Sequence, residues 1–455
     1  MKILFAHQNF PGQYLHLARH LGADPNHQVV FLTQRKDANL PGVRNIVYRP
    51  PREATPKMHH YLRASESYVL NGQAVARIAL DLKRSGFVPD VMVGHNAWGE
   101  IWYLKDVFPQ TPLLGYFEFF YRYAGADVGF DPEVKISADT GPRTRTKNLG
   151  NLLGLDAVDL GQCPTLWQKS TYPERYHPML RVVHEGIDTE VVRPDAGARL
   201  RVPSVESTSH STKPASGQVA GYPPSPLPSP LPHAGEGTYV NSARGETGDF
   251  ELATGDEVVT YVARNLEPYR GFPSFMRALP AILARRPKAR VLIVGGDGVS
   301  YGAPLPDGRT YRQQLLSELG DTLDLSRVHF LGKLPYPVFL KVLQVSRVHV
   351  YLTYPFVLSW SMLEAMSAGC LVVGSRTAPV EEVIRDGENG LLVDFFRPDE
   401  IAERVVAALE SPAAFAPLRE QARRTVVDKY DLKSICLPAQ LRMIEELAAT
   451  GSRHR

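Results

Sequence analysis

The sequence YLTYPFVLSWSMLEAMSAGCLVVGSRTAPVEEVIRDGENGLLVD, residues 351–394, decides the fold of the second half of the chain. An apolar run enters a turn at Tyr354-Pro355, and a short helical segment follows around Ser361–Ser367. A second apolar run, Cys370–Gly374, comes next, and the polar turn Ser375–Pro379 opens another helix. This order of strand, helix and strand predicts a crevice at the carboxyl ends of parallel strands, where open α/β sheets bind nucleotides.

Short apolar runs alternate with helical patterns over both halves of the chain. The runs typical of strands are Ile3–Ala6, Val29–Thr33, Val91–Gly94, Leu113–Tyr116, Val258–Ala263, Ala289–Val294, Val328–Leu331, Val348–Leu352 and Leu371–Gly374. The segments with helical patterning are Gln13–Leu21, Tyr61–Ser85, Glu100–Val107, Phe272–Arg286, Thr310–Leu319, Pro337–Gln344 and Glu400–Leu409. Such alternation predicts parallel sheets that are covered on both faces. Because 455 residues are too many for one ordinary core, we expect an α/β fold of two doubly wound, Rossmann-like domains facing a central cleft.

The composition changes abruptly between the two halves. Residues 204–249 are rich in Ser, Pro, Gly and Thr, and they have too few large apolar residues to offset the entropy of ordering them. This segment is either a tolerated surface insertion or a proline-rich ligand for another protein. The sequence therefore predicts a first domain over 1–190, a linker over 191–256, a second domain over 257–425 and a C-terminal segment over 426–455.

The bulk composition is typical of a globular protein that is not embedded in a membrane. It is 44% hydrophobic and 22% charged with a formal charge of +3, and we expect no nucleic-acid partner. The 3 cysteines lack metal-ligand spacing and suggest a reducing compartment. No apolar run has the length of a transmembrane helix, so we expect a cytoplasmic protein. Basic clusters at 143–147 and 285–290 leave a peripheral contact with the inner face of the membrane open.

Polar residues with a possible chemical role stand where the predicted strands end. Arg264 and Arg270 lie between a strand and a helix, and fixed cations there can stabilise charge on a phosphate leaving group without a metal. Gly12 opens a helix directly after the first strand, where backbone amides favour an anion. Glu118 stands among aromatic residues that would raise its pKa, which suits a proton acceptor. His95 ends a neighbouring strand, and purely structural roles for His95 and Glu118 remain open.

Together these motifs resemble the GT-B fold glycosyltransferases, in particular the retaining family-four enzymes, or glycosyl transferases group one. The resemblance covers residues 257–425 well and residues 1–200 weakly. It implies transfer of a sugar from a nucleotide-diphosphate donor to a hydroxyl, with retention and with no metal or other cofactor. The acceptor would be a glycan, a lipid-linked sugar or a small molecule, as in polysaccharide biosynthesis. It also implies a C-terminal helix that returns to the first domain.

The resemblance also assigns roles to individual residues. It implies that Arg264, Arg270 and Gly12 hold the donor diphosphate, that Glu364, Lys333, Leu334 and Gly296 bind its ribose and base, that Ser359, Trp360 and Glu382 contact the donor sugar, and that Glu118 or His95 is catalytic. Phe356 stands where the family has a first glutamate, so the identity of the donor sugar stays open. Glu364 has a second interpretation, as the partner of Ser361 in a capping box at the helix start.

Two other classes of protein fit parts of the pattern. One is a non-catalytic nucleotide-sugar binder or scaffold protein of the same fold, which the replacement at Phe356 favours and the Arg264 and Arg270 pair disfavours. The other is a nicotinamide-dependent dehydrogenase. It is disfavoured because Gly12 lacks the rest of a Gly-x-Gly-x-x-Gly fingerprint and the second strand ends without a ribose-binding acid.

Overall fold

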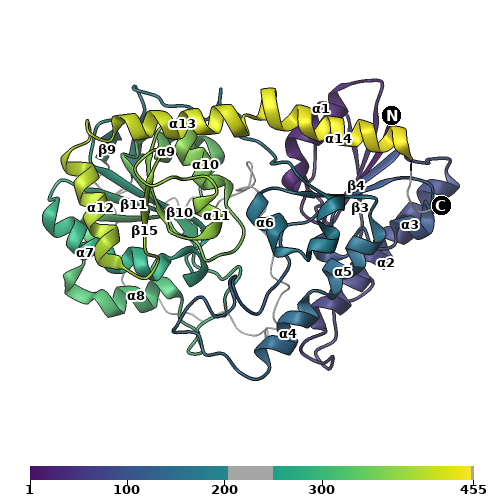
Figure 1. The fold of residues 1–455 in the computed structure, drawn as a ribbon, viewed down its shortest axis with the longest axis horizontal. Helices are drawn as coiled ribbons and strands as arrows, with labels where there is room; N and C mark the ends of the chain where they lie inside the picture. The colour runs from purple at the N-terminus through teal and green to yellow at the C-terminus, as the bar shows by residue number, and fades with distance from the viewer. Residues whose placement is uncertain (203–249, 452–455) are drawn as a thin grey trace, which may run out of the picture.

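The computed structural model describes residues 1–202 and 250–451, which form two parallel sheets with helices on both faces (Figure 1). The first sheet has 7 strands in the order β3-β2-β1-β4-β5-β6-β7, and every neighbouring pair is parallel. Its strands are β1 (Lys2–Ala6), β2 (Gln28–Thr33), β3 (Val43–Val47), β4 (Val91–His95), β5 (Leu113–Tyr116), β6 (Leu160–Cys163) and β7 (Leu180–Val182). Because parallel strands need crossovers, helices link most of them, although residues 34–42 join β2 to β3 without a helix.

Most helices of the first half pack against this sheet, whereas the helix over Thr140–Lys147 packs against the helix that follows it. The helices of this half are α1 (Leu15–Ala23), α2 (Arg63–Arg84), α3 (Leu104–Val107), α4 (Thr140–Lys147), α5 (Leu149–Ala157) and α6 (Leu166–Thr171), with 3-10 turns η1 (Gly12–Tyr14), η2 (Asn96–Trp98) and η3 (Glu174–Met179). The helix expected over Glu100–Val107 is shorter, since residues 100–103 form turns instead. The Glu100 carboxylate accepts hydrogen bonds from the Gln8 backbone (2.8 Å) and the Tyr48 hydroxyl (2.8 Å), which ties this turn to the loop after β1.

The second sheet has 6 parallel strands in the order β12-β11-β10-β13-β14-β15. They are β10 (Val258–Asn265), β11 (Arg290–Gly296), β12 (Val328–Gly332), β13 (Val348–Tyr351), β14 (Leu371–Ser375) and β15 (Leu391–Val393). The helices are α7 (Phe272–Arg285), α8 (Tyr311–Leu319), α9 (Tyr336–Val345), α10 (Trp360–Ser367), α11 (Ala378–Glu381), α12 (Pro398–Glu410) and α13 (Ala416–Tyr430), with short turns η4 (Pro268–Arg270), η5 (Gly320–Thr322) and η6 (Leu325–Arg327). In both sheets the order reverses beside the strand that begins the domain, β1 or β10, as in doubly wound folds.

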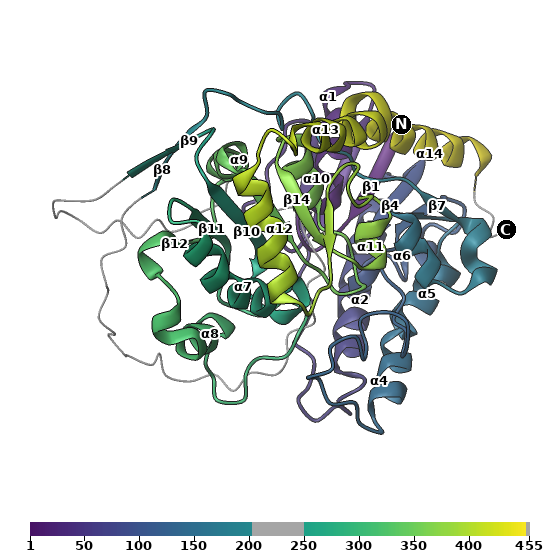
Figure 2. The same cartoon turned by 60° about the vertical axis from the view of Figure 1, so that its left-hand side comes forward.

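A short antiparallel hairpin stands between the two sheets in the sequence. It pairs β8 (Arg199–Val202) with β9 (Phe250–Ala253), and it projects from the second domain away from the first (Figure 2). The predicted insertion at 204–249 lies outside the described residues. Its flanks meet in the hairpin, where Val202 pairs with Phe250, so the segment leaves and re-enters the fold at one place.

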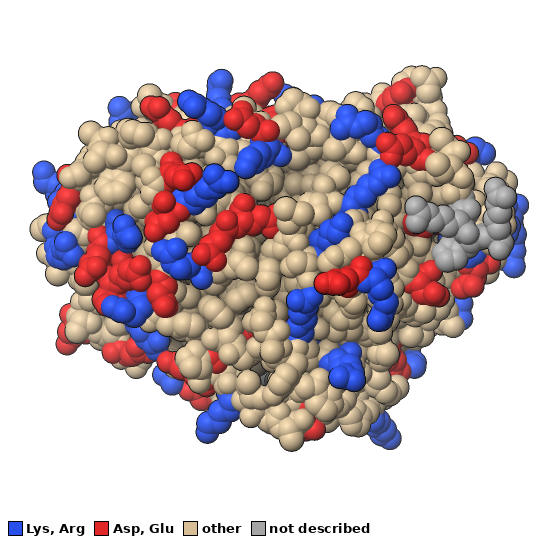
Figure 3. Space-filling model, in the orientation of Figure 1, with Lys and Arg blue, Asp and Glu red and all other residues tan. Residues whose placement is uncertain are grey.

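Apolar strands buried on both faces form the cores. In β10, the six residues from Val258 to Ala263 are all buried, and β13 and β14 are buried throughout. Such continuous apolar runs are typical of parallel sheets covered by helices. On the face seen in Figure 3, Lys and Arg side chains alternate with Asp and Glu side chains over both domains. Among residues 1–202 and 250–451, no helix is both long and apolar enough to cross a membrane.

The last helix, α14 (Leu437–Thr450), lies against the first sheet although it follows the second domain in sequence (Figure 1). A π-helical turn, η7 (Leu432–Cys436), joins it to α13. Met443, Ile444 and Leu447 are buried in the same apolar cluster as Ile3 and Phe5 of β1. The C-terminal segment therefore connects the two sheets by packing as well as by sequence.

Removing the Ile444 side chain tests how much this connection stabilises the fold. Ile444→Ala deletes a fully buried side chain, which costs about 2–5 kcal/mol where the cavity does not collapse. We expect a lower thermal unfolding midpoint than in Glu445→Ala, which changes an exposed neighbour on the same helix. Equal midpoints for the two variants would show that α14 adds little to stability.

Candidate functional site

The carboxyl ends of the two sheets are brought together by hydrogen bonds between the halves. The Trp167 indole donates to the Phe356 carbonyl (2.8 Å), and the Trp360 indole donates to Glu185 Oε2 (2.8 Å). Further along, the Tyr269 hydroxyl donates to Asp127 Oδ2 (2.9 Å). The loops that follow the strands of each sheet therefore line one shared site.

Arg270 is a buried cation on the second-domain side of this site. Its Nη1 donates to Thr353 Oγ1 (2.7 Å) and to the Val357 carbonyl (2.9 Å), and its guanidinium carbon lies 5.3 Å from the centre of the Tyr301 ring. Within the part of the chain that the structure describes, no carboxylate forms an ion pair with Arg270. Neutral dipoles thus hold this guanidinium in place and leave its charge available to an anion.

Arg264 is the second-last residue of β10 and is half-buried. Its electrostatic influence reaches the first domain, since the charges of Arg264 and Arg270 both oppose the rise in the pKa of Glu118. The same two charges oppose the burial-driven rise in the pKa of Tyr301. The predicted pair of cations and the predicted catalytic carboxyl therefore act on one another across the site.

Glu364 is buried in α10, near the start of the helix. The Tyr336 hydroxyl donates to Glu364 Oε1 (2.9 Å), and burial raises the pKa of this carboxyl to about 7 against the opposing effect of that bond. The capping-box interpretation is wrong, because the helix begins at Trp360 and its N-cap is Ser359. Glu364 therefore does not cap its own helix, and its carboxyl bonds to Tyr336 instead.

Three of the positions predicted to bind ribose and base lie side by side. A Cβ on Gly296, at the end of β11, would come within 2.8 Å of Asn265 Oδ1 and of Lys333 Cε. The structure thus brings Gly296 and Lys333 together, with Leu334 next in sequence and half-buried. A side chain at Gly296 would push aside the ends of the Asn265 and Lys333 side chains.

Sequence reasoning missed Glu267, which fixes the loop after β11. Its carboxylate accepts hydrogen bonds from the backbone N–H groups of Ser300 (2.8 Å) and Gly302 (2.9 Å), and from that of Tyr301. This places the Tyr301 ring over Arg270. The only signal in the sequence was an acidic residue between the two arginines, which is too common to single out.

The residues predicted to contact the donor sugar make bonds to protein groups. Ser359 Oγ accepts from the Ser361 backbone (3.4 Å), and the Trp360 indole donates to Glu185. Glu382 accepts from the backbone N–H groups of Leu166 (2.8 Å) and Trp167 (2.6 Å) at the start of α6. The Trp360 and Glu382 contacts join the two halves, and a role of the three residues in binding the sugar stays a prediction.

Phe356 is buried in a cluster of aromatic rings between the two halves. Its ring centre lies 4.6 Å from that of Phe119, 5.2 Å from that of Tyr301 and 5.6 Å from that of Tyr269. Apolar rings therefore occupy the place of the family's first glutamate.

On the first-domain side, Gly12 lies against a buried histidine. It has a φ of +56°, and a Cβ there would come within 2.7 Å of His7 Nε2. Asn9 N donates to His7 Nδ1 (2.9 Å), so His7 Nε2 carries the proton and donates to Gln13 Oε1 (2.8 Å). Gln13 Nε2 in turn donates to Glu118 Oε1 (2.8 Å). This chain of bonds fixes the glycine turn and the carboxyl relative to each other.

Several polar atoms around Glu118 are buried without a hydrogen-bond partner among the described residues. They are Glu118 Oε2, His95 Nε2, Trp98 Nε1 and Tyr14 Oη. His95 Nδ1 accepts from Ala97 N (3.0 Å), so Nε2 carries the proton and lies 3.7 Å from Glu118 Oε1. Because buried polar atoms are nearly always satisfied, this group suits a ligand or water with hydroxyls.

Burial sets the protonation states of this group. It lowers the pKa of His95 to about 3, so the ring is neutral. It raises the pKa of Glu118 to about 8, with the Gln13 hydrogen bond and the two arginines opposing the rise. A carboxyl with a pKa near neutrality can exchange a proton with a substrate. Outside the gaps at 203–249 and 452–455, no group of three His, Cys, Asp or Glu side chains could hold a metal ion.

Two Rossmann-like domains that face one cleft define the GT-B class. The family described as "Glycosyl transferase family 4 group" matches residues 25–192 and "Glycosyl transferases group 1" matches residues 246–425. The two matches together span about three quarters of the chain. The chain therefore belongs to the family-four glycosyltransferases, whose members are retaining, and the predicted fold is confirmed.

Curated relatives match only part of the chain. The D-inositol 3-phosphate glycosyltransferase of Rhodococcus jostii is 30% identical over 172 residues, which cover 37% of this chain and 36% of that protein. The phosphatidyl-myo-inositol mannosyltransferase of Mycobacterium tuberculosis is 28% identical over 206 residues, or 43% of this chain and 49% of that protein. The match thus spans less than half the length of these relatives.

Solved structures match over nearly the whole length. Anabaena HepE in complex with UDP and glucose is 14% identical with a TM-score of 0.60, and covers 99% of this chain and 100% of that one. Sucrose-phosphate synthase of Thermosynechococcus elongatus is 16% identical with a TM-score of 0.66 and the same coverage. At this identity the likeness establishes the fold alone.

Two tryptophans test how strongly polar contacts hold the halves together. Trp360→Phe removes a donor from the buried Glu185, whereas Trp167→Phe removes one from a neutral carbonyl. We expect Trp360→Phe to lower the free energy of unfolding by about 1–3 kcal/mol, because it leaves a buried carboxyl oxygen without its donor, and Trp167→Phe by about 0.5–1.5 kcal/mol. Denaturant titration measures both, and the reverse order would contradict the larger cost at Glu185.

Proposed function

We propose that this protein transfers a sugar from a nucleoside-diphosphate donor to a hydroxyl group, with retention of configuration. The observation that carries the proposal is Arg270, a buried guanidinium held by neutral groups at the cleft, with Arg264 on the strand beside it. Two fixed cations at the carboxyl ends of parallel strands suit a diphosphate that gains charge as the sugar leaves. Membership of the family supports the same activity.

In this proposal the donor spans the two halves. Arg264, Arg270 and the turn at Gly12 bind the diphosphate, and Glu364 accepts hydrogen bonds from the ribose hydroxyls. The backbone at Gly296, with Lys333 and Leu334, lines the base. The solved complexes of HepE with UDP and glucose and with UDP-glucose make uridine nucleotides the first to test.

The same proposal gives the buried polar group a role at the acceptor. Glu118 Oε2 has no partner among the residues described, and it would accept the proton of the attacking hydroxyl. The neutral His95 would donate its Nε2 proton to an oxygen of the sugar or acceptor. Ser359, Trp360 and Glu382 would shape the donor-sugar end of the site through the loops that they fix.

The relatives' names suggest acceptors of the polyol class. They act on inositol phosphate or phosphatidylinositol according to their names, and a glycan or lipid-linked acceptor remains compatible with the site. A cytoplasmic location and contact with a membrane surface stay predictions.

A non-catalytic nucleotide-sugar binder is the second candidate. The aromatic cluster around Phe356 favours it, since a phenylalanine stands where the family has a carboxylate to hold sugar hydroxyls. Release of free sugar from UDP-glucose or a GDP-sugar in a coupled assay distinguishes the two functions, because a binder would leave the donor intact.

Arg264 provides the test of donor binding. Arg264→Ala removes a cation from the proposed diphosphate site, and the loss of a charge-assisted bond costs about 1.5–3 kcal/mol, or roughly ten- to a hundredfold in Kd. Calorimetry with UDP and GDP measures the change. The exposed Arg285→Ala, at the end of α7, is the control and should bind as the wild type. If Arg264→Ala binds UDP and GDP as tightly as the wild type, Arg264 does not hold the diphosphate.

The pKa of Glu118 gives the proposal a pH dependence. Below about pH 8 the carboxyl is protonated and cannot accept a proton, so kcat should rise as the pH passes through about 8. Glu118→Gln should abolish this rise and lower kcat by about 10²–10⁴. Donor hydrolysis provides the assay while the acceptor is being sought. A variant that keeps the rise would show that another group titrates.

A further inference from the structure

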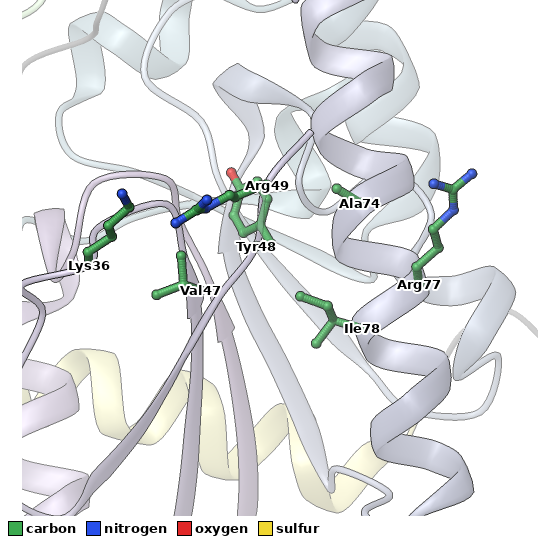
Figure 4. A pocket seen from close by; sticks show the side chains of 7 residues that line it. All are labelled: Lys36, Val47, Tyr48, Arg49, Ala74, Arg77 and Ile78. Carbon is green, nitrogen blue, oxygen red and sulfur yellow. The ribbon is translucent and has the colours of Figure 1, made fainter. Parts of the chain in front are cut away.

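A cavity of about 600 Å³ lies in the first domain between the end of β3 and helix α2 (Figure 4). It is lined by Lys36, Val47, Tyr48, Arg49, Ala74, Arg77 and Ile78. Lys36 follows β2, and Tyr48 and Arg49 follow β3, which is the edge strand of the sheet. The cavity therefore opens at the carboxyl edge of the first sheet, at its outer end.

The lining contains three cations and no acidic residue. Figure 4 shows the Lys36 and Arg49 side chains above Val47, while the Arg77 guanidinium points away from them. Among the described residues, none of the three cations has an ion pair. Asp37 binds Arg35 (3.2 Å) and Glu66 binds Arg52 (2.7 Å), while Glu100 lies beneath the lining and accepts from the Tyr48 hydroxyl. The positive charge of the cavity is thus not neutralised by the protein.

The floor of the cavity is an ordered polar layer. The Tyr48 side chain is buried, and its hydroxyl donates to Glu100 Oε1 (2.8 Å) and accepts from Gln34 Nε2 (3.1 Å). The same Glu100 oxygen accepts from the Gln8 backbone (2.8 Å), in the loop that leads to Gly12. The cavity is therefore preformed, and its floor is continuous with the loop that faces the cleft.

The walls limit what could bind. Val47, Ala74 and Ile78 provide an apolar surface that contacts the carbon skeleton of a ligand. Lys36 and Arg49 together match the double negative charge of a phosphate monoester, and Arg pairs well with planar sets of phosphate oxygens. The volume is in the range of small-molecule sites.

We propose that this cavity binds the phosphate group of a small phosphorylated molecule, such as a sugar or polyol phosphate, while a nucleotide occupies the cleft. The phosphate lies between Lys36 and Arg49, and the remainder of the ligand covers Val47 and Ile78. The phosphate belongs either to a soluble ester or to a lipid headgroup. This site is separate from the nucleotide site, so the cavity proposal can be correct or wrong independently of the proposed function.

Inorganic phosphate is the probe, because it resembles the group that a soluble ester and a lipid headgroup have in common. Titrating the full-length protein into phosphate in the presence of saturating UDP keeps phosphate out of the cleft, and ³¹P NMR reports binding as line broadening. We expect saturable broadening with the wild type and a roughly tenfold or greater loss of affinity in Lys36→Ala/Arg49→Ala. Arg44→Ala changes an exposed cation of β3 outside the cavity and should behave as the wild type.

The other possible results show whether the cavity proposal or the proposed nucleotide site is wrong. No broadening with a wild type that binds UDP, or equal broadening with the double variant, overturns the cavity proposal. If the wild type binds phosphate but not UDP, the proposed nucleotide site is wrong and the cavity proposal is supported. Thermal midpoints of the variants show whether they are folded, and Arg49→Lys, which keeps the charge, should retain binding.

Vesicles distinguish the two sources of the phosphate. If the ligand is a lipid headgroup, the wild type should sediment with vesicles of phosphatidylcholine and phosphatidic acid but not with phosphatidylcholine alone, and the double variant should stay in solution. If the ligand is soluble, the wild type and the double variant should sediment equally while still differing in the phosphate titration.

Discussion

The buried guanidinium of Arg270 constrains the shape of the second domain's cleft. A charge removed from water is costly unless polar groups surround it, and here the groups come from the loop that follows β13, at Thr353 and Val357. The chain turns beside it at Gly271, which has a φ of +69°. A Cβ on this residue would lie only 2.3 Å from the Cβ of Leu352, so no side chain fits there. That loop leads directly into α10, so the position of Glu364 follows from the position of Arg270.

Carboxylates provide most of the polar contacts between the halves. Glu382 binds the start of α6, Glu185 binds the Trp360 indole, and Asp127 binds the Tyr269 hydroxyl. The acids of each half thus accept from donors of the other, whereas the charges of Arg264 and Arg270 oppose the rise in the pKa of Glu118. The contacts that close the cleft are therefore distinct from the charges that we expect to act on a substrate.

The sequence predicted the features that depend on local pattern. Long apolar runs such as Val258–Ala263 located the central strands, and their alternation with helices predicted two doubly wound domains. The GT-B class came from the resemblance of the motifs to a known family. The strands β3, β6, β7, β8, β9 and β15 were missed, because segments of three to five residues carry too little signal. Motif spacing located Arg270 and Glu364, but it did not reveal that Trp360 and Glu382 bond across the cleft. Those bonds join residues more than 170 positions apart, so only the folded structure shows them.

The central claim is that Arg264, Arg270 and Glu364 converge on one nucleotide. A crystal structure of the protein with its tighter-binding nucleoside diphosphate tests this most directly. The account predicts diphosphate oxygens within hydrogen-bond distance of both guanidinium groups and ribose hydroxyls on the Glu364 carboxylate. A nucleotide bound elsewhere, or one that leaves Arg270 bonded only to Thr353 and Val357, would contradict it.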